Sequence, residues 1–391
     1  MRKVLIPILI VFVALAGFFV FRKETRNQGT NLNTKKAEKI TPKNLTYRNP
    51  VDPEALLETK KILKYFYDLS LSNKLQFIIG QNAGTAIKIN YDAADPFLGH
   101  QKYFLDLEKK TGKLPSYIGV DYGSNIIDPK KISKTNELLV GYFKKGGLVE
   151  IDFSPSNPWT GKNYSESFGT GSYKYEDLFI SGTEPNKRWL SDLEKLAKGL
   201  GELQEKGVAV LWRPFQEMNG NWFWWSYGEN GRATSQEYLK LWKYTFNYLT
   251  KEKRIHNLLW IYGPNASSGN KNIKPAKYYY PGDDYVDIVA LDYYSNNLGG
   301  LNVGGDYDDM IAIGKPFGLA EVGAQRGKGF DSLDLIQNFK TKYPNIVFMM
   351  YWNSWVNSLG LFNTNWAIID NKHPKEFMNS EFVITLDELE L

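Results

Sequence analysis

Short apolar runs alternate with longer amphipathic segments from residue 51 to the end of the chain. The short runs hold five or six residues and are rich in β-branched and aromatic side chains. Several of them are apolar on both faces, which is typical of parallel strands that are covered on each side. Eight runs of this kind predict strands: Leu75–Gly80, Tyr117–Tyr122, Leu148–Phe153, Ala209–Arg213, Leu258–Tyr262, Ile288–Asp292, Phe317–Glu321 and Val347–Trp352.

The longer segments between the runs carry apolar residues at helical spacing. In Asn186–Lys206 the apolar positions follow one another at intervals of three or four residues, which places them along one face of a helix. Three other segments have the same pattern. The predicted helices are Lys131–Phe143, Asn186–Lys206, Ser235–Leu249 and Ser332–Lys342.

Eight strands that alternate with helices predict an α/β fold, a (β/α)8 TIM barrel that forms a single catalytic domain over residues 51–391. A doubly wound open sheet is the structural alternative. That fold would require a glycine-rich phosphate-binding turn after an early strand. The sequence Gly-Gln-Asn-Ala-Gly at residues 80–84 is a poor match to such a turn, so the barrel is favoured.

The amino-terminal segment has a different pattern. Residues 4–21 are uninterruptedly apolar and are flanked by Arg and Lys on both sides. The run fits a cleaved signal peptide, with Ala-Leu-Ala at 14–16 as a cleavage site. It also fits a membrane anchor, because it just reaches the length needed to span a bilayer. Residues 1–21 are therefore predicted to be one or the other, which makes the protein secreted or membrane-anchored.

Residues 22–50 are rich in Lys, Asn and Thr and nearly devoid of large apolar side chains, so they are predicted to be a flexible polar linker. Basic charge is concentrated before residue 51. Residues 1–50 hold ten Lys and Arg but two Asp and Glu, which leaves 38 basic and 41 acidic residues for 51–391. The body of the protein is therefore slightly acidic, and composition gives no basic face for nucleic acid.

Composition excludes several kinds of chemistry. Cysteine is absent, which rules out disulfides, thiol nucleophiles and iron–sulfur clusters. The three histidines are far apart in the sequence, at positions 100, 256 and 373, and this leaves little room for a zinc site. Carboxylates are therefore the expected carriers of acid–base chemistry. Four of the 11 Trp residues fall within residues 212–225, and flat aromatic rings beside polar groups suit stacking against sugars.

Two glutamates follow predicted strands at the end where barrel enzymes keep their active sites. Glu217 lies in the turn after the fourth strand, and Glu321 closes the apolar run of the seventh. A carboxylate in apolar surroundings requires partners or a function. Two carboxylates at the mouth of one barrel suggest cleavage of a glycosidic bond by an acid/base and a nucleophile, or by an acid and a base that activates water.

The stretch Arg213–Trp225 resembles the signature Arg-Pro-x-His-Glu-Met-Asn-Gly-x-Trp-Phe-Trp-Trp of glycoside hydrolase family 26, the β-mannanase-like family of clan A. Gly182–Leu193 resembles the segment that precedes it in the family, and Tyr280–Tyr294 resembles the sixth-strand region. The resemblance extends over residues 55–370. It implies a (β/α)8 barrel that hydrolyses β-glycosidic bonds with retention of configuration.

The resemblance also implies roles for individual residues. It implies that Glu217 is the acid/base and Glu321 the nucleophile. Tyr294 is expected to donate a hydrogen bond to the nucleophile. Trp222 and Trp352 are expected to line the subsites nearest the scissile bond.

Other positions bear on the substrate. Arg213 is expected beneath the two carboxylates, where its positive charge favours their ionised forms. Gln216 directly precedes the predicted acid/base and is expected to contact the sugar, but mannanases of the family usually carry His there. Ser154 stands where a Trp-His pair is common, and Asn353 where Arg is common. These departures leave the predicted reaction intact and open the choice of sugar.

The leading interpretation is an exported retaining mannan endo-1,4-β-mannosidase. One alternative is the same fold acting on mixed-linkage β-glucan or β-1,3-xylan. Another is a surface polysaccharide-binding protein that has lost catalysis, although the two glutamates argue against it. A β-linked polysaccharide is the expected partner of a monomeric protein that touches a membrane only through its amino-terminal segment. No metal, cofactor or nucleic acid is expected.

Overall fold

The computed structural model describes residues 38–39, 42, 44–84, 96–123, 128–161, 173–226, 233–324, 329–354 and 364–391. The described residues belong to one compact unit, Lys35–Leu391. The predicted export segment 1–21 lies outside the described residues and stays a prediction. Among the helices of the described ranges, none is both long and apolar enough to cross a membrane.

Eight parallel strands close into a barrel, since each pairs with the next and β1 pairs with both β2 and β8. The predicted TIM-barrel fold is confirmed. A short ninth strand pairs with Phe77 and Ile78, the first two residues of β1. The strands are β1 (Phe77–Asn82), β2 (Tyr117–Asp121), β3 (Leu148–Phe153), β4 (Val210–Pro214), β5 (Leu258–Tyr262), β6 (Ile288–Tyr294), β7 (Phe317–Gly323), β8 (Ile346–Tyr351) and β9 (Val383–Ile384).

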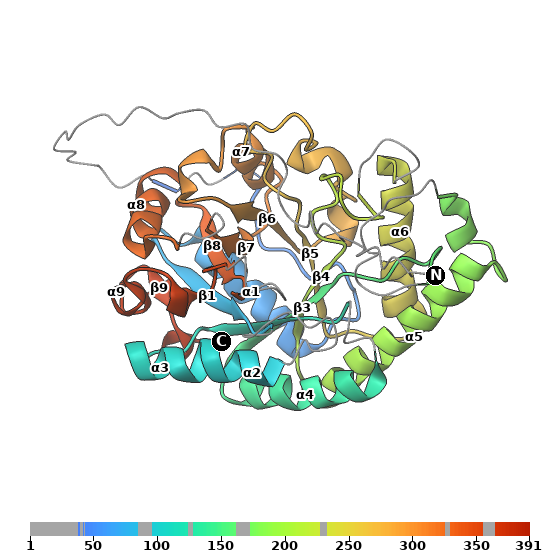
Figure 1. The fold of residues 1–391 in the computed structure, drawn as a ribbon, viewed down its shortest axis with the longest axis horizontal. Coiled ribbons are helices and arrows are strands. Elements are labelled where there is room, and N and C mark those ends of the chain that lie inside the picture. The colour runs from blue at the N-terminus through green and yellow to red at the C-terminus, as the bar shows by residue number, and fades with distance from the viewer. Residues whose placement is uncertain are drawn as a thin grey trace, which may run out of the picture. The chain divides into compact units, whose positions relative to one another are not determined.

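Helices surround the strands and connect them in the order that a (β/α)8 barrel requires (Figure 1). Two of them continue into a π-helical turn, Gln101–Leu105 before α3 and Tyr248–Glu252 after α6. The helices are α1 (Leu57–Leu71), α2 (Pro96–His100), α3 (Asp106–Thr111), α4 (Pro129–Lys144), α5 (Glu184–Glu205), α6 (Ser235–Asn247), α7 (Asp306–Ile311), α8 (Ser332–Lys342) and α9 (Pro374–Met378).

The apolar core has two parts. The larger one lies between the strands and the outer helices, and it includes the buried face that the helical spacing predicted for α5. The smaller one fills the barrel interior and extends to α1, where the rings of Phe66 and Phe348 meet edge to face at 5.5 Å. Helix α1 thus closes the amino-terminal end of the barrel and leaves the carboxyl ends of the strands for the site.

Residues 44–50 lie against the barrel, although the composition of residues 22–50 predicts a flexible linker. Leu45 is buried, and Asn44 donates hydrogen bonds to the carbonyl oxygens of Ala312 and Ile313. Arg48 forms an ion pair with Asp283 at 2.8 Å. For this part of the segment the linker prediction is wrong. A few apolar and polar contacts attach it to the barrel, and average composition does not reveal them.

Candidate active site

Charged side chains gather where the barrel strands end. Asp152 on β3 pairs across the sheet with Arg213 on β4, and Asp292 on β6 pairs with Glu321 on β7. In a parallel barrel all strands run in the same direction, so residues near their carboxyl ends meet at one end of the barrel. These four side chains are buried in the barrel mouth rather than solvated.

Arg213 contacts four carboxyl groups with its buried guanidinium. Its Nε lies 3.2 Å from Glu150, and Nη1 donates to both oxygens of Asp292 at 2.9 and 3.1 Å. Its Nη2 lies 2.7 Å from Asp152 and 2.7 Å from Glu321. One fixed positive charge therefore holds together acids from β3, β6 and β7. The sequence predicts Arg213 beneath both glutamates, and the guanidinium contacts Glu321, whereas Glu217 is held by other donors.

Glu217 lies just beyond β4 on a strained turn. Its φ is 54° and that of Phe215 is 56°, in the left-handed region that L side chains seldom adopt. The backbone N–H of Glu217 donates to the carbonyl of Gly263, at the end of β5, at 2.9 Å. Strain of this kind persists only where surrounding contacts enforce it, and it is often found at functional sites. The turn places the Glu217 side chain in the barrel mouth.

Both carboxylate oxygens of Glu217 accept hydrogen bonds from neutral donors. The Asn265 amide donates to Oε1 at 2.7 Å, and the indole N–H of Trp222 donates to Oε2 at 2.8 Å. Trp222 reaches this position by lying against Gly220, where an added Cβ would stand 2.3 Å from the indole ring. Trp222 therefore holds the acid directly, besides any role it has in lining the cleft.

Glu321 is held from two sides. Arg213 donates to its Oε1 at 2.7 Å, and the hydroxyl of Tyr294 donates to its Oε2 at 2.5 Å. The second contact is the one that the family resemblance implied for Tyr294. Donors on both oxygens stabilise negative charge on the carboxylate and fix its orientation.

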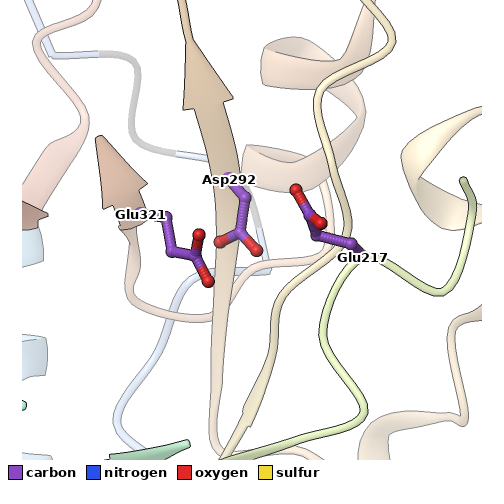
Figure 2. Close-up of side chains that lie close together, drawn as sticks. All are labelled: Glu217, Asp292 and Glu321. Atoms are coloured by element: carbon purple, nitrogen blue, oxygen red, sulfur yellow. The ribbon is translucent and has the colours of Figure 1, made fainter. Parts of the chain in front are cut away.

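Glu217 and Glu321 face the same space, with Asp292 between them in the view of Figure 2. One carboxylate oxygen of each of the three residues lies within 4.8 Å of those of the other two. Retaining glycosidases place their two carboxyl groups about 5–5.5 Å apart, whereas inverting enzymes require about 6.5–9.5 Å. The closest oxygens of the two glutamates, within 4.8 Å of each other, lie nearer than the range for inverting enzymes.

Burial raises the pKa values of four acids in the barrel mouth. Burial and the negative charge of Glu321 raise the pKa of Glu217 to about 7. Burial likewise raises the pKa of Glu150 to about 7, and it raises the pKa values of Asp152 and Asp292 well above their ordinary range. One guanidinium does not offset the desolvation of these four carboxyl groups.

Glu217, Asp292 and Glu321 are close enough to share a cation, and among the described residues they form the acidic group with that geometry. However, Arg213 already donates hydrogen bonds to both oxygens of Asp292 and to one oxygen of Glu321. The guanidinium thus supplies the positive charge that a metal ion would otherwise bring. We interpret the group as an arginine–carboxylate network rather than a metal site.

Gln216 and Ser154, two positions where the chain departs from the family pattern, contact each other. The amide nitrogen of Gln216 donates to the Ser154 hydroxyl, while its buried amide oxygen has no hydrogen-bond partner among the residues that the structure describes. The backbone N–H of Ser154 in turn donates to Asp121 at the end of β2. Gln216 and Ser154 are therefore linked by a hydrogen bond next to Glu217, and the amide oxygen of Gln216 can accept a hydrogen bond from a sugar hydroxyl.

Trp352 follows β8 and is half-buried, with its backbone N–H bonded to the carbonyl of Val322 at 3.1 Å. Its place at the end of β8 is compatible with the predicted subsite, which stays a prediction. The neighbouring Asn353 is buried close to Gly84 at the end of β1.

Several site residues were not singled out from the sequence. Glu150 and Asp152 alternate on a strand predicted to be buried, and acids at such positions were a usable signal. Asp292 ends a predicted strand, as Glu321 does. Asn265 carries no comparable signal, because an amide three residues past β5 is ordinary in a loop.

Comparisons with known proteins agree with this geometry. A family model described as glycosyl hydrolase family 26 matches residues 51–388. Mannan endo-1,4-β-mannosidase A and B of Caldalkalibacillus mannanilyticus is 36% identical over 275 residues, 66% of this chain and 52% of that protein, so the chain spans about half the length of this relative. The mannan endo-1,4-β-mannosidase of Bacillus subtilis is 30% identical over 335 residues, 82% of this chain and 88% of that protein. A solved structure of a Bacillus subtilis mannanase superimposes with a TM-score of 0.73 at 29% identity, covering 88% of this chain and 97% of that one.

Proposed function

The chain belongs to glycosyl hydrolase family 26, and on that premise we propose that it is an exported mannan endo-1,4-β-mannosidase that acts with retention of configuration. The observation that carries the proposal is the pair Glu217 and Glu321, buried in the barrel mouth with carboxylate oxygens within 4.8 Å of each other. Mannan as substrate rests on the named activity of the relatives. Export rests on the apolar run at residues 4–21.

In the first step Glu321 attacks the anomeric carbon while Glu217 protonates the departing glycosidic oxygen. Arg213 and Tyr294 each donate a hydrogen bond to one oxygen of Glu321, which orients the nucleophile. The raised pKa of Glu217, about 7, keeps it protonated in neutral or mildly acidic solution, as a general acid must be. The products of this step are a glycosyl–Glu321 ester and the released sugar chain.

In the second step water attacks the anomeric carbon, and Glu217 takes the proton from that water. The glycosyl–Glu321 bond breaks, which frees the sugar and returns Glu321 to a carboxylate. Esterification removes the negative charge of Glu321, which is one cause of the raised pKa of Glu217. The pKa of Glu217 therefore falls when the intermediate forms, and the group becomes a base. One carboxyl thus serves both halves of the reaction, because the charge of its neighbour changes between them.

Release of reducing sugar from β-1,4-mannan, mixed-linkage β-glucan and β-1,3-xylan tests the proposal. We expect release from mannan, with oligosaccharides of several lengths early in the reaction, as an endo-acting enzyme gives. Release from glucan or xylan alone would overturn the assigned substrate. It would indicate that Ser154 and Gln216 change the sugar specificity. Binding without release from any of the three would overturn the assigned activity.

A further inference from the structure

We propose that Asn265, fixed by Asn219, is a positioning residue that holds the carboxyl group of Glu217 and favours its ionised form. The proposal rests on the proposed function, because it assigns Asn265 a part in the work of the acid/base. Asn265 lies in the connection between β5 and β6, far from Glu217 in the sequence, and its amide donates to Oε1 of Glu217 at 2.7 Å.

Asn219 fixes the backbone of Asn265 with two hydrogen bonds. The side-chain oxygen of Asn219 accepts from the Asn265 N–H at 2.8 Å, and its side-chain nitrogen donates to the Asn265 carbonyl at 2.7 Å. The same nitrogen donates to the carbonyl of Lys274 at 2.8 Å. Asn219 is fully buried, so these bonds are shielded from water. A single amide therefore joins the turn that bears Glu217 to the loop that bears Asn265.

The donors around Glu217 suit its ionised form. Trp222 and Asn265 each direct an N–H at one carboxylate oxygen. A protonated carboxyl turns one oxygen into a hydroxyl, and neither an indole N–H nor an amide NH2 group accepts its hydrogen. The observed contacts thus give each oxygen of the carboxylate a donor, whereas neither contact accepts the hydrogen of the carboxylic acid.

Other groups near Glu217 act in both directions. Burial and the negative charge of Glu321 raise its pKa, whereas Asn265, Trp222 and the charge of Arg213 lower it. Asp292 and Tyr294 also interact electrostatically with Glu217. Since Glu217 must lose its proton after the glycosyl–enzyme forms, donors that favour the carboxylate are needed in the second step. Asn265 is placed to supply one.

The test is the pH profile of kcat/KM for Asn265→Ala on mannan oligosaccharides. The basic limb of this profile is the fall in kcat/KM as Glu217 loses its proton. Loss of the donor should move that limb to higher pH by about one unit. Asn265→Asp, which keeps the size but replaces the donor with a carboxylate, should move it further. We also expect kcat on mannan to fall by about 10- to 100-fold with little change in KM.

Asn219→Ala should shift the limb in the same direction, and it should add nothing in the Asn265→Ala background, because Asn219 acts through Asn265. A structural role alone would give additive losses and leave the limb in place. Asn272→Ala changes an exposed residue of the same loop and serves as the matched control. Thermal unfolding of each variant separates loss of fold from loss of positioning.

An unmoved basic limb in folded Asn265→Ala would overturn the inference while leaving the proposed function intact. Failure of the proposed function is distinct, since the unaltered protein would then release no sugar from mannan. A limb that shifts equally in Asn272→Ala would also contradict the inference, because the shift would then be independent of the contact with Glu217.

Discussion

Arg213 shows how the site depends on contacts that span the sequence. Three of its four carboxylate partners, Glu150, Asp292 and Glu321, lie 63, 79 and 108 residues away along the chain. Glu321 was predictable as a partner because its place at a strand end is visible in the sequence. Glu150 was not, because its contact depends on the stagger between strands, which local patterns do not encode.

The roles proposed for the two glutamates can be distinguished by kinetics. Glu321→Ala should lower turnover of every substrate by at least about 10³-fold, because no group remains to form the ester. Glu217→Ala should lower mannan hydrolysis by about 10²- to 10⁴-fold. It should still form the glycosyl–enzyme from an aryl mannoside with a good leaving group, which needs no proton. Burst kinetics with that substrate check the difference, and a burst in Glu321→Ala would refute the nucleophile assignment.

The pH dependence follows from Glu217. Because its pKa is raised to about 7, the protonated form that the first step requires is present below that pH and is lost above it. We expect kcat/KM to fall as pH rises through about 7. In Glu217→Gln, whose amide does not titrate, this limb should disappear from the residual activity. Initial rates across pH check both statements, and a basic limb that persists in Glu217→Gln would assign it to another group.

Gln216 and Ser154 should act as one unit on specificity. The free amide oxygen of Gln216 is an acceptor for a sugar hydroxyl, and we expect Gln216→Ala to lower kcat by roughly 10²-fold. Ser154→Ala should add little to it, since Ser154 acts by orienting the amide. Gln216→His should shift the mannan-to-glucan activity ratio. Additive losses and an unchanged ratio would place both residues outside substrate recognition.

At the scale of elements, the strands were predicted closely and the turns poorly. The run Leu258–Tyr262 is β5 as predicted, and Ser332–Lys342 is α8. Each buries a regular face, so its period is visible in the sequence. The turn at Glu217 was foreseen only as a turn, because its left-handed backbone is enforced by contacts such as the bond to Gly263. Strand β9 has two residues, too few for any period.

The segment 44–50 allows a test at the same scale. A chain that begins at residue 51 loses the buried Leu45 and the Arg48–Asp283 ion pair, whereas a chain that begins at residue 35 keeps them. We expect the shorter chain to lose about 2 kcal/mol of unfolding free energy. Its specific activity should be unchanged, because these contacts lie at the amino-terminal end of the barrel. Denaturant unfolding checks this, and equal stability of the two chains would show that the segment contributes nothing.

At the scale of the whole molecule, closure of the barrel brings the carboxyl ends of eight short strands together around one opening. Acids from β3, β6 and β7 meet the arginine of β4 there, and the turn after β4 adds Glu217. Helix α1 and the apolar interior close the opposite end, so the chemistry is confined to one face. The fold was predictable because alternation of strands and helices repeats through the chain, whereas the pairing of donors with each glutamate emerges only when the barrel closes.

The central claim is that Glu217 and Glu321 cleave β-1,4-mannan by double displacement. Proton NMR of a mannan oligosaccharide during hydrolysis tests it most directly, because the anomer formed first is visible before mutarotation. The spacing of the two carboxylates, with oxygens within 4.8 Å, predicts that the β anomer appears first. First appearance of the α anomer would contradict the mechanism.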